Sequence, residues 1–340
     1  MKATQLSQPA SAAPGRTMMQ AIVQRRYGTR AEDVLALEQV ATPAIGADEV
    51  LVQVRAAGVD RGTWHLMAGQ PYLMRLLGFG LRGPKNPVPG LDVAGTVVAA
   101  GADVTRFAAG EEVFGIASGS FAEYAAARED KLARKPARLS FTQAAAVAVS
   151  GLAAVAGLRA GRLHAGQKVL VVGASGGVGS YAVQLAKAFG AQVTGVASTG
   201  KADLVASIGA DHVIDYTHDD FADGRAHYDL ILDIGGNSRL ARLRRALTPT
   251  GTLVIAGGEG ARWTGVGRQL RALMLSPFIR QRLTTYISRH RQDDLETLSQ
   301  LTGTGKVTPH IGQTYPLTGV PQAIRDLQAG HARGKNAITI

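Results

Sequence analysis

The sequence predicts an α/β protein in which a doubly wound parallel sheet is joined to a separate antiparallel β domain. Residues 168–187 read as strand, glycine turn and helix without interruption. Strand-like and helix-like runs then alternate up to residue 258, which is typical of a parallel sheet with helices on both faces. Residues 20–141 contain short alternating runs broken by Gly, Pro and Asp, which favours antiparallel strands.

The antiparallel part is expected to begin near Met18 and to end before an alanine-rich helix at Thr142–Leu158. That helix leads into the parallel part. The strand-like runs of the antiparallel part are residues 20–26, 49–59, 90–101, 111–117 and 121–127.

The parallel part is expected to continue beyond the glycine turn with strands at 191–198, 212–216, 228–235 and 251–258 and helices at 202–208 and 238–247. Residues 259–281 form a less regular, basic and apolar insert. A sixth strand is predicted within 282–288, with a helix at 293–301 before or after it. From Val307 the chain is expected to return to β structure, with one helix near 321–327.

The glycine turn at residues 173–179 predicts a dinucleotide site. Val169–Val172 is an apolar, β-branched run that suits a strand buried on both faces. Glycines let the backbone approach a pyrophosphate, and the N–H groups and dipole at the start of the next helix attract the anion. Strand, turn and helix occur in the order that this mechanism requires. The expected contacts are Ala174, Ser175, Gly176, Gly177, Val178 and Gly179.

Composition limits the possible functions. The chain has 340 residues, 46% hydrophobic and 19% charged, which suits about two globular domains. No apolar stretch reaches the ~18 residues of a membrane helix, so we expect a soluble, cytoplasmic protein. The absence of Cys excludes disulfides, thiolate zinc sites and cysteine nucleophiles. Residues 1–17 read as a disordered extension, with an organellar transit peptide as the alternative.

The charge balance favours anionic ligands. Lys and Arg outnumber Asp and Glu by 37 to 26, which gives a net charge of +11, and such a field attracts phosphorylated cofactors and, less specifically, nucleic acid. The arginines at 239–245 and 262–282 alternate with leucines at helical spacing, which is typical of a solvated helix face. Nucleic-acid and membrane partners are therefore not expected.

Several motifs are spread along the chain, namely AAGVDRGTWHLMAG at 56–69, PVPGLDVAGTV at 87–97, GSFAEYAA at 119–126, QAAAVAVSGLAAVAGL at 143–158, VVGASGGVG at 171–179, GADHVIDY at 209–216 and ARGKNAITI at 332–340. In these motifs and in the order of its parts, the chain resembles the medium-chain dehydrogenase/reductase superfamily, and most closely its zinc-independent branch of quinone oxidoreductases, zeta-crystallin and reticulon-4-interacting-like reductases. The resemblance covers nearly the whole chain. It implies a GroES-like catalytic domain formed by 18–142 and 305–340, a Rossmann domain at 143–304, and a homodimer.

The same resemblance predicts that no metal is bound. The catalytic zinc ligands of the zinc-dependent relatives correspond to Asp60, Leu91 and Ala153 or Ala154 here. Leucine and alanine cannot bind zinc, and one carboxylate falls short of three ligands. A residual site made of Asp60, His65 and Asp92 is the alternative.

The residues beyond the turn favour NADPH over NADH. An Asp or Glu about 20 residues past the fingerprint marks NAD enzymes, but the sequence there is Ser198, Thr199, Gly200, Lys201. Hydroxyls and an ammonium suit a 2′-phosphate, although a plain polar turn is the alternative. Tyr216 matches a family tyrosine beside the same phosphate.

The far end of the cofactor is expected at the ends of later strands, where glycine lets the backbone come close. Lys335 matches a family lysine on the cofactor side of the cleft. The expected contacts at these strand ends are Gly235, Asn237, Ala256, Gly257 and Gly258.

With no metal and no acid–base dyad, the simplest expected chemistry is direct hydride transfer to a hydrophobic quinone or α,β-unsaturated carbonyl. Tyr72 and Tyr27 are the candidate proton donors, and Asp60 would lie near the nicotinamide. Apolar walls are expected from Trp64, Leu66, Met67 and Tyr72 and from parts of the 259–281 insert with Trp263. The alternatives are a zinc-independent NADP alcohol dehydrogenase and a weakly catalytic nucleotide- or RNA-binding protein like zeta-crystallin.

Overall fold

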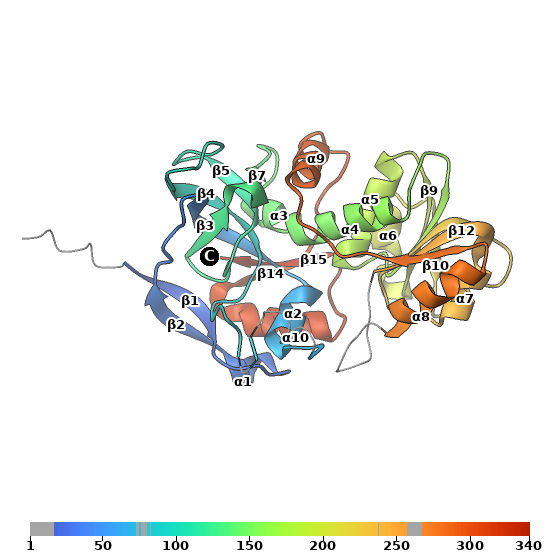
Figure 1. Cartoon of the computed structure of the whole chain (residues 1–340), viewed down its shortest axis with the longest axis horizontal. Coiled ribbons are helices and arrows are strands. Elements are labelled where there is room, and N and C mark those ends of the chain that lie inside the picture. The colour runs from blue at the N-terminus through green and yellow to red at the C-terminus, as the bar shows by residue number, and fades with distance from the viewer. Residues whose placement is uncertain (1–16, 73–74, 76–79, 82, 237, 257–266) are drawn as a thin grey trace, which may run out of the picture.

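The computed structural model describes residues 17–72, 75, 80–81, 83–236, 238–256 and 267–340. These residues form a six-stranded parallel sheet, a seven-stranded sheet that is mostly antiparallel, and a two-stranded ribbon. Figure 1 shows the two large sheets side by side, with the helices α3 (Phe141–Ala145) and α4 (Ala148–Ala160) between them. The predicted fold class is confirmed.

The parallel sheet has the order β10-β9-β8-β11-β12-β13. Strand β8, near the middle of this sheet, is buried on both faces. Its side chains Val169 and Val171 face the core beneath α4 and α5. Leu170 and Val172 face the core on the opposite side, beneath α7 and α8. The strands are β8 Lys168–Val172, β9 Gln192–Ala197, β10 His212–Asp215, β11 Tyr228–Asp233, β12 Leu247–Ile255 and β13 Arg282–Thr285. The helices of this part are α5 Gly177–Ala188, α6 Ala202–Ser207, α7 Leu240–Arg245 and α8 Gly267–Leu275.

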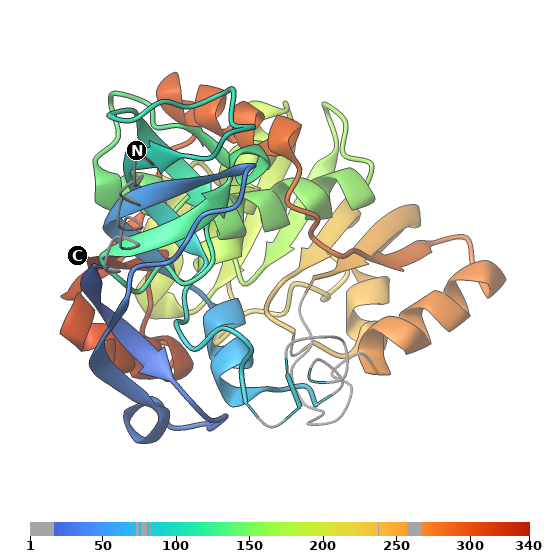
Figure 2. The same ribbon diagram turned by 60° about the vertical axis from the view of Figure 1, so that its left-hand side comes forward.

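The second sheet combines strands from both ends of the chain in the order β14-β15-β3-β4-β5-β7, with β6 paired to β3. The β1–β2 ribbon, blue in Figure 2, packs against this sheet, because Ile22 of β1 shares a core cluster with Ala57 and Ile338. The strands are β1 Met18–Gln24, β2 Leu35–Ala41, β3 Glu49–Val59, β4 Asp92–Ala100, β5 Glu112–Ile116, β6 Tyr124–Arg128, β7 Leu132–Arg134, β14 Ile311–Pro316 and β15 Lys335–Thr339. The helices beside it are α1 Ala31–Val34, α2 Arg61–Ala68 and α10 Val320–Gln328.

The single helix predicted at Thr142–Leu158 is two helices, α3 Phe141–Ala145 and α4 Ala148–Ala160. The break has a tertiary cause. Asp92 on β4 accepts a hydrogen bond from the backbone N–H of Val149 at 2.7 Å, so its carboxylate caps the start of α4. A cap supplied by a distant strand leaves no local sequence signal.

Other boundaries also shift. The helix predicted at 238–247 ends at Arg245 because Leu247 already begins β12, and the sixth strand stops at Thr285. The helix predicted near 293–301 follows this strand as α9 Gln292–Gly303. Of the predicted insert, 267–275 is helical and 257–266 lies outside the described residues.

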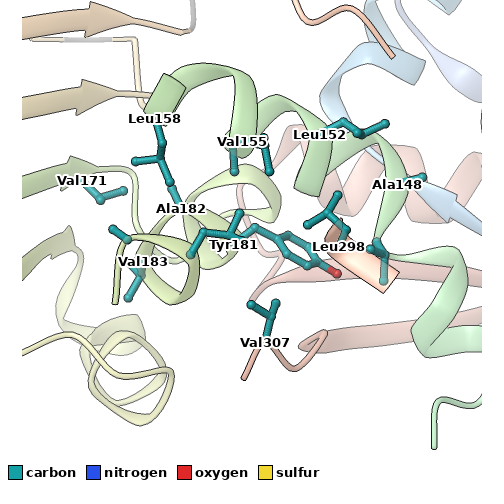
Figure 3. Packing of buried hydrophobic residues seen from close by; sticks show 14 of the residues in the cluster. Ala148, Leu152, Val155, Leu158, Val171, Tyr181, Ala182, Val183, Leu298 and Val307 are labelled. Atoms are coloured by element: carbon teal, nitrogen blue, oxygen red, sulfur yellow. The ribbon is translucent and has the colours of Figure 1, made fainter. Parts of the chain in front are cut away.

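One core cluster joins the two parts of the molecule. It contains Ala94 and Phe114 of the antiparallel sheet together with Val169 and Val171 of the parallel sheet. Figure 3 shows Tyr181 of α5 among the side chains of α4 and α9, and its hydroxyl donates to Ala146 O at 3.1 Å. This shared core packs the glycine turn, through Ala174, against the antiparallel sheet.

Candidate active site

The glycine turn has the geometry of an anion-binding turn. Gly173 has φ +86°, a conformation that favours glycine. A Cβ on Gly179 would lie 2.1 Å from Gly173 O, so the turn and α5 can approach this closely only with glycine there. Gly176 is the N-cap of α5, whose first N–H groups and positive dipole end therefore suit a pyrophosphate.

The ends of the neighbouring strands meet this turn. Gly235 N donates to Val172 O at 3.0 Å, and Ala256 N donates to Asp233 O at 2.9 Å. The structure thus brings Gly235 directly beside Gly173, as the predicted cofactor path requires. Asn237, Gly257 and Gly258 lie outside the described residues.

The predicted 2′-phosphate site has a more mixed charge than its sequence indicates. Thr199 donates its hydroxyl to Asp215, which β10 brings beside the end of β9. Hydrogen bonds from Thr199 and Thr217 lower the pKa of Asp215 to about 2. Tyr216 is 58% exposed and follows this strand. A carboxylate therefore lies next to the predicted phosphate ligands, and sequence spacing did not reveal it.

A segment near the C-terminal end of the chain reaches the same place and brings the cation Arg333 there. Lys201 Nζ donates to Gly330 O at 2.6 Å and to Ala332 O at 2.8 Å. Arg333 Nη2 contacts both carboxylate oxygens of Asp203, at 2.8 and 2.6 Å. Burial, together with the positive charge of Arg333, lowers the pKa of Lys201. Residues 330–335, hereafter the return segment, thus lie along this face.

The return segment also touches the glycine turn. Gly334 N donates to Ser175 O at 2.9 Å, and Gly334 forms a parallel bridge with Gly176. A Cβ on Gly177 would lie 3.0 Å from Ser150 Oγ and 3.5 Å from Lys335 Cδ. Glycine at position 177 therefore leaves room for the side chains of Ser150 and Lys335 beside the turn.

Lys335 ends in a buried cluster of polar groups. Its Nζ lies 2.6 Å from Asp92 Oδ2, 3.0 Å from Ser150 Oγ and 3.4 Å from Asp60 Oδ2. Lys335 is 2% exposed, Asp92 0% and Asp60 7%. Burial raises the pKa of Asp92 to about 6, with Lys335 opposing and Asp60 reinforcing the shift. The Lys335 ammonium thus contacts carboxylates and a hydroxyl, all supplied by the protein.

Asp60 also has a local structural task. It is the N-cap of α2, and its Oδ1 accepts from the backbone N–H of Thr63 at 3.0 Å. Because its other oxygen faces Lys335, this carboxylate links the start of α2 to the buried cluster. Its predicted position near the nicotinamide stays a prediction.

These residues do not fit a zinc site. Zinc needs three or more N, S or O ligands from the protein, and Leu91 and Ala153 have none to offer. His65 Nδ1 lies 3.1 Å from Gln70 O. Across the described ranges, no three His, Cys, Asp or Glu side chains are arranged to hold a metal. The alternative site of Asp60, His65 and Asp92 is therefore not assembled.

The two candidate proton donors both contact one arginine, Arg75. Arg75 stacks over Tyr27 at 4.3 Å and over Tyr72 at 4.7 Å, measured from its guanidinium carbon to the ring centres. Tyr27 donates its hydroxyl to Gly80 O at 2.8 Å, so it is already engaged. Met67, expected to line the acceptor pocket, is 1% exposed and belongs to the core instead.

Sequence reasoning missed a second buried ion pair. Asp233 ends β11 with no exposed surface and pairs with Arg268 of α8, which also donates to Gly236 O. Burial raises the pKa of Asp233, and Arg268 opposes the shift. The available signal was an Asp at the end of a buried strand, two residues before a pair of glycines.

A cavity of about 400 Å³ lies elsewhere, at the amino ends of β12 and β13. The glycine turn lies at the opposite, carboxyl edge of the same parallel sheet, so this cavity does not mark the cofactor site. The cavity is lined by Ala241, Arg244, Arg245, Pro249, Ile279, Arg280 and Gln281.

None of the helices in the described ranges is both long and apolar enough to cross a membrane.

Comparison with known proteins agrees with this architecture. Residues 46–137 match the alcohol dehydrogenase GroES-like domain, and residues 208–338 match the zinc-binding dehydrogenase family. The 2-methylene-furan-3-one reductase of Solanum lycopersicum is 33% identical over 90% of this chain and 76% of its own length. The NADPH-dependent alkenal/one oxidoreductase of Arabidopsis thaliana is 33% identical over 98% and 85%.

A solved structure gives the same result. The quinone oxidoreductase from Coxiella burnetii superposes with a TM-score of 0.84 at 27% identity, over 95% of this chain and all of its own. Together with the glycine turn and the two sheets, these matches establish the family. The chain belongs to the medium-chain dehydrogenase/reductase superfamily, in its quinone oxidoreductase branch, and is an oxidoreductase with a pyridine nucleotide cofactor.

Proposed function

We propose that this protein uses NADPH to reduce a hydrophobic quinone or α,β-unsaturated carbonyl, without zinc. The observation that carries the proposal is the position of the return segment. It contacts Lys201 just beyond the end of β9 and brings Arg333 to the same face. It also directs Lys335 into the carboxylates of Asp60 and Asp92. The relatives named for quinone and alkenal/one reduction support the acceptor class.

The chain would hold the cofactor mainly through its backbone. The first N–H groups of α5 would bind the pyrophosphate, and Gly173 and Gly235 leave space for close approach. Ser198, Lys201 and Arg333 would face the 2′-phosphate. When bound, the nicotinamide supplies the hydride, so the protein's task is to orient the cofactor against the acceptor and exclude water.

Quinones and enones suit this site because they accept hydride without a Lewis acid. The reduced product still needs a proton, for which solvent and the Tyr72 hydroxyl are the sources. Tyr72, Asp60 and the cofactor contacts remain predictions, as do a homodimer and a cytoplasmic location.

The test of cofactor choice compares kcat/KM for NADPH and NADH with a panel of quinones and enones. We expect NADPH to be preferred, and we expect Arg333→Ala to lower kcat/KM for NADPH about tenfold while leaving NADH unchanged, because one charge-assisted hydrogen bond is lost. Arg225→Ala, which removes an 89% exposed arginine side chain, is the matched control. A preference for NADH would refute the cofactor assignment.

The same assays separate the alternatives. Reversible alcohol oxidation with NADP would indicate an alcohol dehydrogenase. No turnover, combined with salt-dependent binding of single-stranded RNA, would indicate the nucleic-acid alternative. Stoichiometric zinc that is lost together with activity on chelation would contradict zinc independence.

A further inference from the structure

Helix α8 carries apolar side chains on two opposite sides. Its inner side packs on the parallel sheet, where Ala272 is fully buried and Leu275 contacts the same core cluster. Its outer side presents Leu270, Leu273 and Met274, all of which are exposed. At 3.6 residues per turn these three positions lie together, away from Ala272. A surface helix ordinarily has polar and charged residues on its outer side, so α8 departs from that pattern.

Another exposed apolar side chain follows directly after the helix. Phe278 ends the short 3₁₀ helix Ser276–Phe278 and is 84% exposed. Figure 2 shows α8 as an orange helix at the edge of the parallel part. Apolar side chains gathered on a surface in this way mark an interaction site. The set formed by Leu270, Leu273, Met274 and Phe278 is hereafter the outer stripe.

The surroundings of the outer stripe are basic. Residues 267–292 contain six arginines and no Asp or Glu. Arg271 and Arg280 are exposed, and within the described part of the chain neither has a hydrogen-bonding or ion-pair partner for its side chain. Uncompensated positive charge therefore lies beside exposed apolar surface, which favours a partner that is both anionic and apolar.

The cavity at the amino ends of β12 and β13 adds a place for an anion. Its volume is about 400 Å³, and its lining includes the arginines Arg244, Arg245 and Arg280. The carboxylate of Asp220 is 4.0 Å from Arg245 and is already paired with another arginine of α7 at 2.9 Å. Guanidinium groups gathered in this way suit a phosphate. Because Arg280 follows Phe278 by two residues, this cavity adjoins the outer stripe.

The combination of charge and apolar surface decides between partners. In a two-fold dimer built on the outer stripe, the same patch would face itself, so Arg271 and Arg280 would meet arginines and no carboxylate. Nucleic acid would pair with the arginines but would leave the leucines in water. A bilayer that contains anionic phospholipids satisfies both, because its phosphates meet the arginines and its acyl boundary accepts the apolar side chains.

We propose that the outer stripe and the arginines around it bind the surface of a membrane that contains anionic phospholipids, with a lipid phosphate in the arginine-lined cavity. The protein lies on the bilayer and does not cross it. The sequence gave no expectation of a membrane partner, because arginines that alternate with leucines are typical of a solvated helix face. In the structure the leucines of α8 are themselves on the exposed side. The inference goes beyond the proposed function and uses none of its assignments.

The test is flotation of the full-length protein with vesicles of phosphatidylcholine alone and of phosphatidylcholine mixed with phosphatidylglycerol. We expect binding to the mixed vesicles only, and weaker binding as salt is added, because salt screens the headgroup charge. Met274→Gln/Phe278→Gln removes apolar contacts and keeps the charge, whereas Arg271→Gln/Arg280→Gln does the reverse. Each double variant should lower the partition coefficient at least about tenfold.

Matched controls make the same changes on the antiparallel part of the molecule. Leu37→Gln/Val98→Gln removes two exposed apolar side chains, and Arg25→Gln/Arg128→Gln removes two exposed arginines. Both controls should bind the mixed vesicles as the wild type does. Losses in the controls equal to those in the outer-stripe variants, or equal binding to the two kinds of vesicle, would overturn the proposal.

Two further results would assign the surface to another partner and so refute the proposal. One is a wild-type dimer in sedimentation that dissociates in Met274→Gln/Phe278→Gln, with no vesicle binding, because the outer stripe would then be covered by a second copy. The other is calorimetric binding of inorganic phosphate without vesicle binding. Reductase activity enters none of these readouts, so a wrong cofactor or acceptor assignment would leave the result unchanged.

Discussion

Lys335 Nζ lies 2.6 Å from the Asp92 carboxylate although 243 residues separate the two along the chain. Neither residue is more than 2% exposed. The contact connects the last strand of the protein to β4 and, through the Asp92 cap, to the start of α4. The side chain of Lys335 therefore contacts the sheet through Asp92 and passes beside Gly177 of the glycine turn.

Removal of that charge is expected to be costly. Lys335→Met keeps the length of the side chain but leaves Asp60 and Asp92 buried without a counter-ion, so we expect the free energy of unfolding to fall by about 3–5 kcal/mol. Urea unfolding measures it. Lys335→Met/Asp92→Leu should recover part of the loss, since an apolar replacement removes the uncompensated carboxylate.

The exposed pair of Arg25 and Glu38 provides the control. Arg25→Ala should change the free energy of unfolding by less than about 1 kcal/mol, because solvent screens an exposed ion pair. Equal losses for Arg25→Ala and Lys335→Met would show that burial does not distinguish the two contacts.

The stability of the protein should depend on pH through Asp92. Its folded-state pKa is raised to about 6 from an ordinary 3.8, so the folded state binds this proton more tightly than the unfolded chain. The contribution of Asp92 to the free energy of unfolding is therefore fully present below pH 3.8 and is lost as the pH rises through 6. Urea titrations of wild type and Asp92→Asn across this range measure it. The wild type should lose stability relative to the variant, and a constant difference would contradict the shift.

The glycine turn should not tolerate a side chain at position 179. A Cβ there would lie 2.1 Å from Gly173 O, which only a shift of the backbone can relieve. We expect Gly179→Ala to weaken NADPH binding, measured by cofactor fluorescence, by about tenfold or more. Gly303→Ala, at the end of α9, is the control, because a Cβ there meets only the Pro136 ring at 3.6 Å, an ordinary contact. Equal binding by the two variants would argue against this turn as the cofactor site.

The Asp215 carboxylate, which accepts from Thr199, should reduce the preference of the enzyme for NADPH over NADH. Asp215→Asn removes a negative charge next to the predicted phosphate site, so we expect the ratio of kcat/KM for NADPH to that for NADH to rise about two- to fivefold. Asp223→Asn makes the same charge change at a carboxylate paired with Arg225 and should leave the ratio unchanged. A fall in the ratio for Asp215→Asn would place the phosphate elsewhere.

Tyr72 is testable as a proton donor. Tyr72→Phe retains the ring that stacks on Arg75 and removes only the hydroxyl, so we expect kcat to fall at least about a hundredfold with KM for NADPH unchanged. Steady-state kinetics with an enone measures both. Tyr27→Phe should leave kcat nearly unchanged, because that hydroxyl already donates to Gly80 O. An unchanged kcat in Tyr72→Phe would leave solvent as the proton source.

The sequence predicted what is local or periodic. The strand, turn and helix at 168–187 form because apolar runs and glycines act over a few residues, and the alternation after them specifies a parallel sheet. The charged pairs escaped prediction because their partners are distant. Arg333 meets Asp203 across 130 residues, Arg268 meets Asp233 across 35, and Asp215 reaches Thr199 only through strand pairing. Register and burial, which decide such contacts, are properties of the fold.

The position of the return segment has a consequence for synthesis. The glycine turn and its helix leave the ribosome long before Gly334 and Lys335, so the nascent chain holds Asp60 and Asp92 without their cation until residue 335 has been added. The final strand then completes both the sheet and the cofactor face, as Ile340 N reaches Arg55 O at 3.3 Å. A chain that stops short of Gly334 would lack both the contact of the return segment with the glycine turn and the ammonium between Asp60 and Asp92.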